Sequence, residues 1–212
     1  RTKDGLLTPE AFARQAGSDF RLKKVAECYA LYQRRLREAD AMDFDDLLCR
    51  TVELFMENPD VLERYQNRYR YLMVDEYQDT NHAQYRLISL LAEKSGNLCV
   101  VGDDDQSIYK FRGATIENIL SFEDEFKGCT VIRLEQNYRS TKTILNAANA
   151  VIAKNVNRKG KTLWTDNAQG RAIQMVELEN EDEEGRFIAD TLLDGVGEGR
   201  RYSDFAVLYR AN

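Results

Sequence analysis

The fold is decided by a ten-residue stretch that reads Tyr71-Leu72-Met73-Val74-Asp75-Glu76-Tyr77-Gln78-Asp79-Thr80. It begins as a short apolar run and stops abruptly at two adjacent carboxylates. A helical pattern follows, with apolar residues at Tyr85, Leu87, Ile88, Leu90 and Leu91. Such a run is typical of a buried strand that leads into a helix.

Two further apolar runs end in the same way. Residues 98–101 stop at Gly102-Asp103, and residues 130–134 lead into Glu135-Gln136-Asn137. Short apolar runs that alternate with helices indicate a parallel sheet in an α/β domain. Ligands gather at the carboxyl ends of parallel strands, so we expect these polar clusters to lie together.

The flanking regions predict mainly helices. Apolar periodicity predicts a helix over residues 20–41, and Asp43 is expected to cap a second one that ends at Asn58-Pro59. Later in the chain we expect a helix from Ser140-Thr141 to about residue 153, a strand over 172–178, a helix over 180–193 and a strand over 204–209. This last strand–helix–strand set suggests a separate second sheet.

Composition excludes several classes of protein. The 212 residues are 43% hydrophobic and 31% charged, which is ordinary for a globular protein. No apolar run approaches the roughly 18 residues that would span a membrane, and the first residues do not resemble a signal peptide.

Four scattered cysteines and the single His82 exclude a zinc site of the usual spacing. The cysteines are expected to be reduced core residues, which favours a cytoplasmic protein. The net charge of −6 neither supports nor excludes nucleic-acid binding.

The pair Asp75-Glu76 carries the strongest chemical signal. Two carboxylates at the tip of a hydrophobic strand are what a Walker B element requires. In that reading Asp75 holds Mg²⁺ at the phosphates of a nucleotide, and Glu76 orients and deprotonates the attacking water. The dipeptide alone favours a solvated acidic turn, since adjacent Asp-Glu pairs are common.

Longer motifs point to one family. Residues 75–81 resemble motif II of the UvrD/PcrA/Rep superfamily 1 DNA helicases, residues 101–114 resemble their motif III, and residues 134–140 resemble their motif IV. Residues 42–48 also match a segment that precedes motif II in this family. The resemblance covers essentially the whole chain.

The resemblance implies an α/β fold of the P-loop NTPase (RecA-like) type, with incomplete parallel sheets and an N-terminal helical accessory segment. Residues 1–42 would end the helical accessory subdomain, residues 43–134 would form the C-terminal part of the first RecA-like domain, and residues 135–212 would begin the second. The implied cofactors are ATP and Mg²⁺.

The resemblance also implies roles for single residues. Gln106 would sense the γ-phosphate, Tyr138 would stack on adenine, and Arg139 would reach the γ-phosphate as an arginine finger. Single-stranded DNA would contact the segment that carries Tyr109, Phe111 and Arg112, and a weaker match near DNA is Arg210. Relatives usually carry tryptophan where Phe111 stands, so a weaker or differently tuned DNA contact is expected here. Arg112 could meet either DNA phosphate or the motif II carboxylates.

The implied activity is ATP-driven translocation on single-stranded DNA, 3′ to 5′, with unwinding at junctions of single- and double-stranded DNA. No G-x-x-x-x-G-K-[ST] motif occurs in the sequence, so we expect this segment alone to hydrolyse no ATP and to need the remainder of the parent helicase chain. Two alternatives stay open: a helicase–nuclease subunit of the RecB/AddA kind, and a non-catalytic DNA-binding module that kept the fold. Self-association through an uncovered sheet edge is also plausible, although the oligomeric state does not follow from the sequence.

Overall fold

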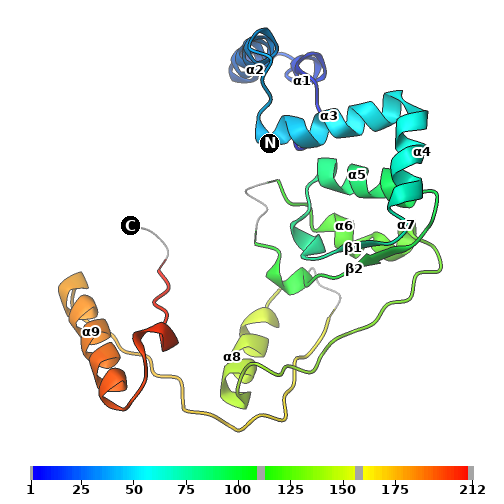
Figure 1. Ribbon diagram of the computed structural model, residues 1–212. Helices are drawn as coiled ribbons and strands as arrows, with labels where there is room; N and C mark the ends of the chain where they lie inside the picture. The colour runs from blue at the N-terminus through cyan, green and yellow to red at the C-terminus, as the bar shows by residue number, and fades with distance from the viewer. Residues whose placement is uncertain (1, 109–112, 156–159, 210–212) are drawn as a thin grey trace. The chain divides into compact units, whose positions relative to one another are not determined.

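The computed structural model describes residues 2–108, 113–155 and 160–209 (Figure 1). They divide into two compact units. The first contains residues 1–136 and 148–164, and the second contains residues 137–147 and 165–212. The first unit holds the sheet and most of the helices.

The chain begins with a helical pair. Helix α1 (Pro9–Gln15) is capped by the Thr8 hydroxyl, which accepts a hydrogen bond from the Ala11 N–H, and proline occupies its first position. Helix α2 (Phe20–Glu38) is capped by Asp19 and packs against α1. The helix predicted over residues 20–41 is therefore confirmed, with its end three residues earlier.

The apolar core of the first unit lies between three helices. Helix α3 (Phe44–Glu57) starts with the predicted cap Asp43, which forms a capping box with Asp46. Helix α4 (Pro59–Arg68) and helix α5 (His82–Ala92) pack on α3 and on each other. Figure 1 shows α5 between α3 and the sheet. The buried side chains at the centre are Val52, Phe55 and Leu90.

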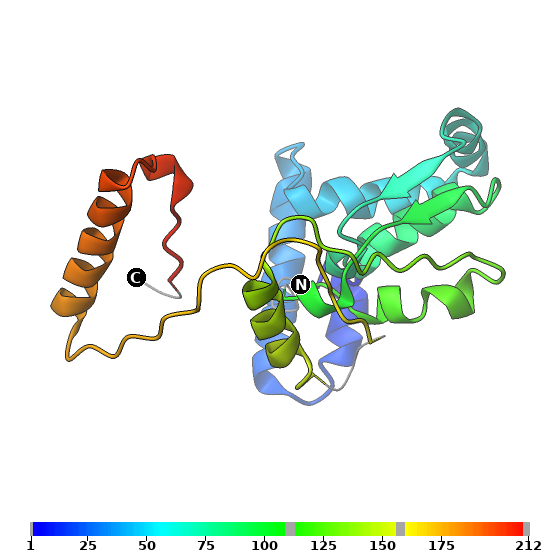
Figure 2. The same ribbon diagram turned by 90° about the horizontal axis from the view of Figure 1, so that it is seen from below.

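The predicted parallel pairing is present. Strand β1 (Leu72–Val74) pairs in parallel with strand β2 (Leu98–Val100), with Leu72 opposite Leu98 and Val74 opposite Val100. The Tyr77 N–H donates to the Val101 carbonyl at 3.0 Å, which extends the contact past the strands. The segments that follow β1 and β2 therefore leave the sheet at the same edge, as Figure 2 shows from a second direction.

A 3-10 turn, Tyr77–Asp79, follows β1 and is anchored by its first residue. The Tyr77 ring is fully buried and meets Phe122 edge to face, with the ring centroids 5.7 Å apart. This burial raises the pKa of Tyr77 to about 12. Phe122 opens the short helix α7 (Phe122–Glu125), which follows α6 (Glu117–Leu120), so α6 and α7 hold the turn in place.

The remaining helices are α8 (Lys142–Ile152), which crosses the boundary between the units, and α9 (Glu181–Gly197) in the second unit. Asn180, the first residue of the helix predicted over 180–193, caps α9 by accepting the Glu183 N–H. A 3-10 turn, Tyr202–Asp204, leads to Phe205, whose ring lies so close to Gly195 that a Cβ there would be 2.4 Å from it. Glycine at residue 195 is therefore required by packing.

Three predicted strands are wrong. Residues 130–134, 172–178 and 204–209 form no strand among the described residues, apart from an isolated bridge between Gln136 and Trp164 beyond the first of them. The second sheet expected for residues 135–212 is consequently absent from the described part of this unit. A strand requires a neighbour that pairs its N–H and C=O groups, and the described chain supplies none to these segments. Their apolar side chains stay exposed, including Met175 and Leu208.

The cysteines partly contradict the core prediction. All four are unpaired, but Cys28 and Cys99 are exposed, and Cys49 and Cys129 are half-buried. Cys28 lies on the outer side of α2, and Cys99 is the outward residue of β2, so the local apolar sequence misled the prediction. None of the helices in the described ranges is both long enough and apolar enough to cross a bilayer.

A buried ion-pair cluster joins the N-terminal segment to α3. Lys3 is 6% exposed, and its Nζ lies 2.6 Å from Asp43 and 2.9 Å from Asp46. The Tyr32 hydroxyl donates to Asp43, and the Gln33 amide donates to Asp46. Burial alone would raise the pKa of each carboxyl, but the hydrogen bonds from Lys3 outweigh it and the pKa of both is lowered. The same bonds overcome desolvation and raise the pKa of Lys3.

We expect Phe55→Ala to lower the free energy of unfolding of this chain by about 3–5 kcal/mol, because it opens a cavity in the core. Urea unfolding followed by circular dichroism measures this change. The matched control is Phe44→Ala in the same helix, since Phe44 is 90% exposed and its loss should cost less than about 0.5 kcal/mol. Equal losses for the two variants would contradict the assigned core.

We expect Lys3→Met to lower the free energy of unfolding by about 3 kcal/mol at neutral pH, because it leaves two partly buried carboxylates without their cation. Lys24→Met, which removes an exposed pair with Glu27, should cost less than about 1 kcal/mol.

The loss of unfolding free energy caused by Lys3→Met should also depend on pH. The carboxyls have a lowered pKa in the folded state, so the stability they contribute is present above the ordinary value of 3.8 and is lost as pH falls below it. Unfolding curves between pH 7 and pH 3 should therefore converge for the two proteins at the acid end. A deficit that stays constant over this range would contradict the ion-pair assignment.

Candidate functional site

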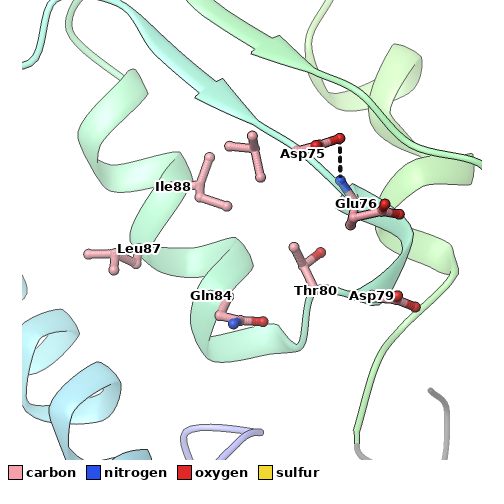
Figure 3. A pocket seen from close by; sticks show the side chains of 8 residues that line it. Asp75, Glu76, Asp79, Thr80, Gln84, Leu87 and Ile88 are labelled. Carbon is pink, nitrogen blue, oxygen red and sulfur yellow. Dashed lines mark hydrogen bonds between the residues drawn. The ribbon is translucent and has the colours of Figure 1, made fainter. Parts of the chain in front are cut away.

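The predicted carboxylates lie at the carboxyl end of β1. Asp75 and Glu76 are exposed, and they line a pocket of about 360 Å³ together with Val74, Asp79, Thr80, Gln84, Leu87 and Ile88 (Figure 3). The apolar side of the pocket comes from α5, and the acidic side comes from the turn after β1. Three acidic residues thus line one cavity at the edge where ligands of parallel sheets bind.

Glu76 has a strained backbone. Its φ of 50° and ψ of 41° lie in the left-handed region, which costs a non-glycine residue on the order of 1 kcal/mol. The Asp75 carboxylate accepts the Glu76 N–H at 2.9 Å and so supports this conformation. The turn directs the Glu76 side chain back toward Gln78 instead of letting it continue the alternation of the strand.

The Glu76 carboxylate is held by a buried amide. Gln78 is 1% exposed, and its Nε2 donates to Glu76 Oε2 at 2.7 Å. Its Oε1 accepts the Asp103 N–H at 2.9 Å. A backbone N–H can only donate, so Oε1 must face Asp103 and Nε2 must face Glu76. The orientation of the amide is therefore fixed by its partners.

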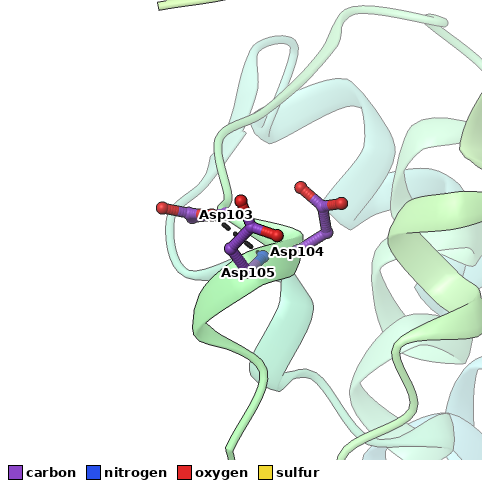
Figure 4. Close-up of side chains that lie close together, drawn as sticks. All are labelled: Asp103, Asp104 and Asp105. Carbon is purple, nitrogen blue, oxygen red and sulfur yellow. Dashed lines mark hydrogen bonds between the residues drawn. The ribbon is translucent and has the colours of Figure 1, made fainter. Parts of the chain in front are cut away.

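The loop after β2 continues this chain of hydrogen bonds. Asp103 Oδ2 accepts from Gln106 Nε2 at 2.7 Å, and Asp103 Oδ1 accepts the Asp105 N–H at 3.0 Å. Figure 4 shows Asp103, Asp104 and Asp105 grouped on the 3-10 turn Asp104–Gln106. The predicted residues Glu76 and Gln106 are thus connected through Gln78 and Asp103.

A lysine compensates the charge of this acidic loop. Lys161 Nζ bonds to Asp103 and lies 3.6 Å from Asp104 and 3.8 Å from Asp105. Burial would raise the pKa of Asp103, but the bonds from Lys161 and Gln106 outweigh it and lower that pKa. Asp103 is therefore held in its ionised form. The oxygens of the three aspartates lie within 4.8 Å of one another.

The residues around β1 offer the type of donor that Mg²⁺ prefers, but among the described residues only Asp103, Asp104 and Asp105 bring three such atoms within 4.8 Å of one another. This ion prefers carboxylate oxygens and water, and three carboxylates line the pocket. Asp79 Oδ1 is buried and has no hydrogen-bond partner within the described chain. Burial, and then the charge of Glu76, raise the pKa of Asp79. A cation in this pocket would give Asp79 Oδ1 a partner and would offset the repulsion between the carboxylates.

The second unit holds the other predicted nucleotide contacts. The Asn137 side-chain oxygen accepts the N–H groups of Arg139 and Ser140 at 3.0 and 2.7 Å. The Asn167 amide donates to the carbonyls of Tyr138 and Ser140 at 3.2 and 3.1 Å. Two asparagines therefore fix the backbone of this loop, while the side chains of Tyr138 and Arg139 are exposed.

The predicted DNA contacts Tyr109, Phe111, Arg112 and Arg210 lie outside the described residues. Among the described ones, the structure joins Asp75, Glu76 and Gln106 in one hydrogen-bonded edge. Tyr138 and Arg139 belong to the other unit.

Sequence reasoning missed three participants: Gln78, Asp103 and Lys161. Gln78 lies within the quoted motif. The signal that could have found it is a single amide side chain among the acidic residues Asp75, Glu76 and Asp79. Asp103 and Lys161 are 58 residues apart, and nothing in their local sequence indicates that they pair.

Comparisons with known proteins identify one family. Residues 1–127 match the model of the UvrD/REP helicase N-terminal domain, and residues 132–212 match that of the UvrD-like helicase C-terminal domain. The chain is 52% identical over 210 residues to the ATP-dependent DNA helicase PcrA of Staphylococcus aureus (strain Mu50 / ATCC 700699), and equally to that of Staphylococcus epidermidis (strain ATCC 12228 / FDA PCI 1200). These matches cover 99% of the chain but only 29% of the relatives' length.

Proposed function

Since this chain belongs to the UvrD/REP helicase family, we propose that it forms part of the ATP-hydrolysing core of a DNA helicase. The observation that carries the proposal is the pair Asp75 and Glu76 at the carboxyl end of β1, linked by hydrogen bonds to the loop of Gln106. The parent protein would couple ATP hydrolysis to movement along single-stranded DNA.

Asp75 would hold Mg²⁺, which supplies charge compensation to the phosphates when bound. Glu76 would act as the general base that takes a proton from the attacking water. Gln78 occupies one carboxylate oxygen of Glu76, which leaves the other for water. Gln106 would sense the γ-phosphate, since an amide can donate to phosphate and accept from water.

Tyr138 and Arg139 would complete the nucleotide site from the second RecA-like domain. The exposed ring of Tyr138 would stack on adenine, and Arg139 would reach the γ-phosphate. Arginine fingers of this kind contribute about 10³–10⁵ in rate. The two asparagines that brace the loop support this role, because they fix the backbone and leave both side chains accessible.

Single-stranded DNA would lie along Tyr109, Phe111 and Arg112, with Arg210 contributing from the second domain. Aromatic rings stack on bases without reading their sequence, so these contacts suit a translocase. We propose movement from 3′ to 5′ and unwinding at junctions of single- and double-stranded DNA, in line with the family resemblance.

The proposed domains are residues 1–42 for the helical accessory subdomain, 43–134 for the first RecA-like domain and 135–212 for the second. The remainder of the parent helicase would supply the P-loop and further strands beside β1 and β2. The four unpaired cysteines support a cytoplasmic location.

We expect Glu76→Gln to lower DNA-stimulated ATP turnover of the full-length protein that contains this segment by at least about 10²-fold, because the base is lost. ATP binding, followed with a fluorescent ATP analogue, should be retained. Asp60→Asn, in the exposed first turn of α4, serves as a carboxylate-to-amide control and should keep full turnover. A Glu76→Gln protein that turns over at the control's rate would refute the assignment of the base.

We also expect the 212-residue chain alone to hydrolyse no ATP with or without single-stranded DNA, since its sequence contains no P-loop motif to hold the β-phosphate. Phosphate release from the purified chain, beside the same chain with Glu76→Gln, measures this. Turnover that DNA stimulates and that Glu76→Gln removes would contradict the prediction.

A further inference from the structure

The hydrogen bonds around Gln78 connect the two loops that leave the sheet. One end of its amide holds the carboxylate that follows β1, and the other end holds the backbone that follows β2. Resting on the proposed function, we infer that Gln78 is a positioning residue: it orients the Glu76 carboxylate toward the attacking water and ties it to the loop of Gln106.

The Glu76 carboxylate is held from outside its own backbone. Glu76 is exposed and its backbone is strained, so nothing in its own conformation fixes the side chain. The Gln78 Nε2 contact of 2.7 Å is the bond that the structure records to this carboxylate. Gln78 itself is 1% exposed and cannot swing away, because its other end is bound to the backbone of Asp103. The buried residue therefore holds the exposed one.

Gly102, just after β2, packs closely against the Gln78 amide. A Cβ at this residue would lie 2.7 Å from Gln78 Oε1, 2.8 Å from Ile119 Cδ1 and 3.2 Å from the Tyr77 nitrogen. The φ of Gly102 is not in the left-handed region, so the backbone does not require glycine there. The requirement comes from close packing by three groups, the Gln78 amide, the Ile119 side chain and the Tyr77 backbone, which together occupy the space of the missing side chain.

Asp103 connects Gln78 to Gln106. Asp103, whose N–H binds Gln78, also accepts the side-chain amide of Gln106 at 2.7 Å. A displacement of either loop therefore changes the position of Gln78, and with it the position of Glu76 Oε2. The hydrolytic carboxylate and the proposed γ-phosphate sensor are in this way parts of one hydrogen-bonded unit.

The test compares variants of the full-length protein that contains this segment. Gln78→Met removes both hydrogen bonds at similar volume. Gln78→Glu keeps an acceptor for the Asp103 N–H but presents a carboxylate to Glu76. Gly102→Ala keeps the Gln78 side chain but shifts its amide, because the added Cβ would lie 2.7 Å from Oε1. The control is Gln33→Met, which removes an equally buried amide that donates to a carboxylate, Asp46, away from this edge.

We expect all three site variants to lower kcat for DNA-stimulated ATP hydrolysis by about 10- to 100-fold, as is usual for residues that orient a reactive group. KM for ATP should change less than about twofold, because binding depends on other residues. Gln33→Met should lower the melting temperature but keep its kcat. A merely structural role of Gln78 would instead give the same pattern for Gln78→Met and Gln33→Met, and would leave Gln78→Glu active.

The outcomes separate the two proposals. If the wild type hydrolyses ATP in response to single-stranded DNA and Gln78→Glu and Gly102→Ala keep its kcat, the inference about Gln78 is overturned and the proposed function stands. If the wild type shows no DNA-dependent turnover, both are overturned. Because Gln78→Glu and Gly102→Ala each retain part of the contact, the result does not depend on whether Gln78→Met folds.

Discussion

The parallel pairing of β1 with β2 is the constraint on which the site depends. Because the strands run in the same direction with Val74 opposite Val100, the segments that follow them leave the sheet side by side. Each then carries polar groups that cannot remain in a strand: Asp75 and Glu76 on one side, Asp103 and Gln106 on the other. Gln78 and Asp103, which are 25 positions apart, become hydrogen-bonded neighbours for this reason. An antiparallel pairing would have placed the two loops at opposite ends of the sheet.

The helices and the first strand pair could be predicted from the sequence because their signals are local. Asp43 and Asn180 cap their helices within three residues, and the apolar period of α2 lies within the helix itself. The carboxylates of the site were likewise visible, because a strand that stops at Asp75-Glu76 is a local pattern. Their connection was not visible. Whether Gln78 faces Glu76 depends on the left-handed turn at Glu76 and on the glycine at residue 102, which belong to different segments.

The strands predicted over 130–134, 172–178 and 204–209 failed for a physical reason. Apolar periodicity records which residues need burial, but a strand forms only when a neighbour pairs its backbone. In the described chain Ile132 stays 77% exposed and Leu208 stays 94% exposed. Met73, inside an actual strand, is also 80% exposed, because α5 does not cover its face of the sheet. The sequence indicates that these apolar side chains need burial. Within the described residues they remain exposed.

The chemistry of the site explains why an amide occupies residue 78. The two loops bring together carboxylates from Asp75, Glu76, Asp79 and Asp103, and Lys161 compensates only the group after β2. A carboxylate at residue 78 would add repulsion to this edge in a position that is 1% exposed. A lysine would satisfy Glu76 but could not accept the Asp103 N–H. Only a neutral group that both donates and accepts can bridge a carboxylate and a backbone N–H without changing the charge of the site. Glutamine also has the length to do so, and it leaves the negative charge on the pocket side available for a cation and for water.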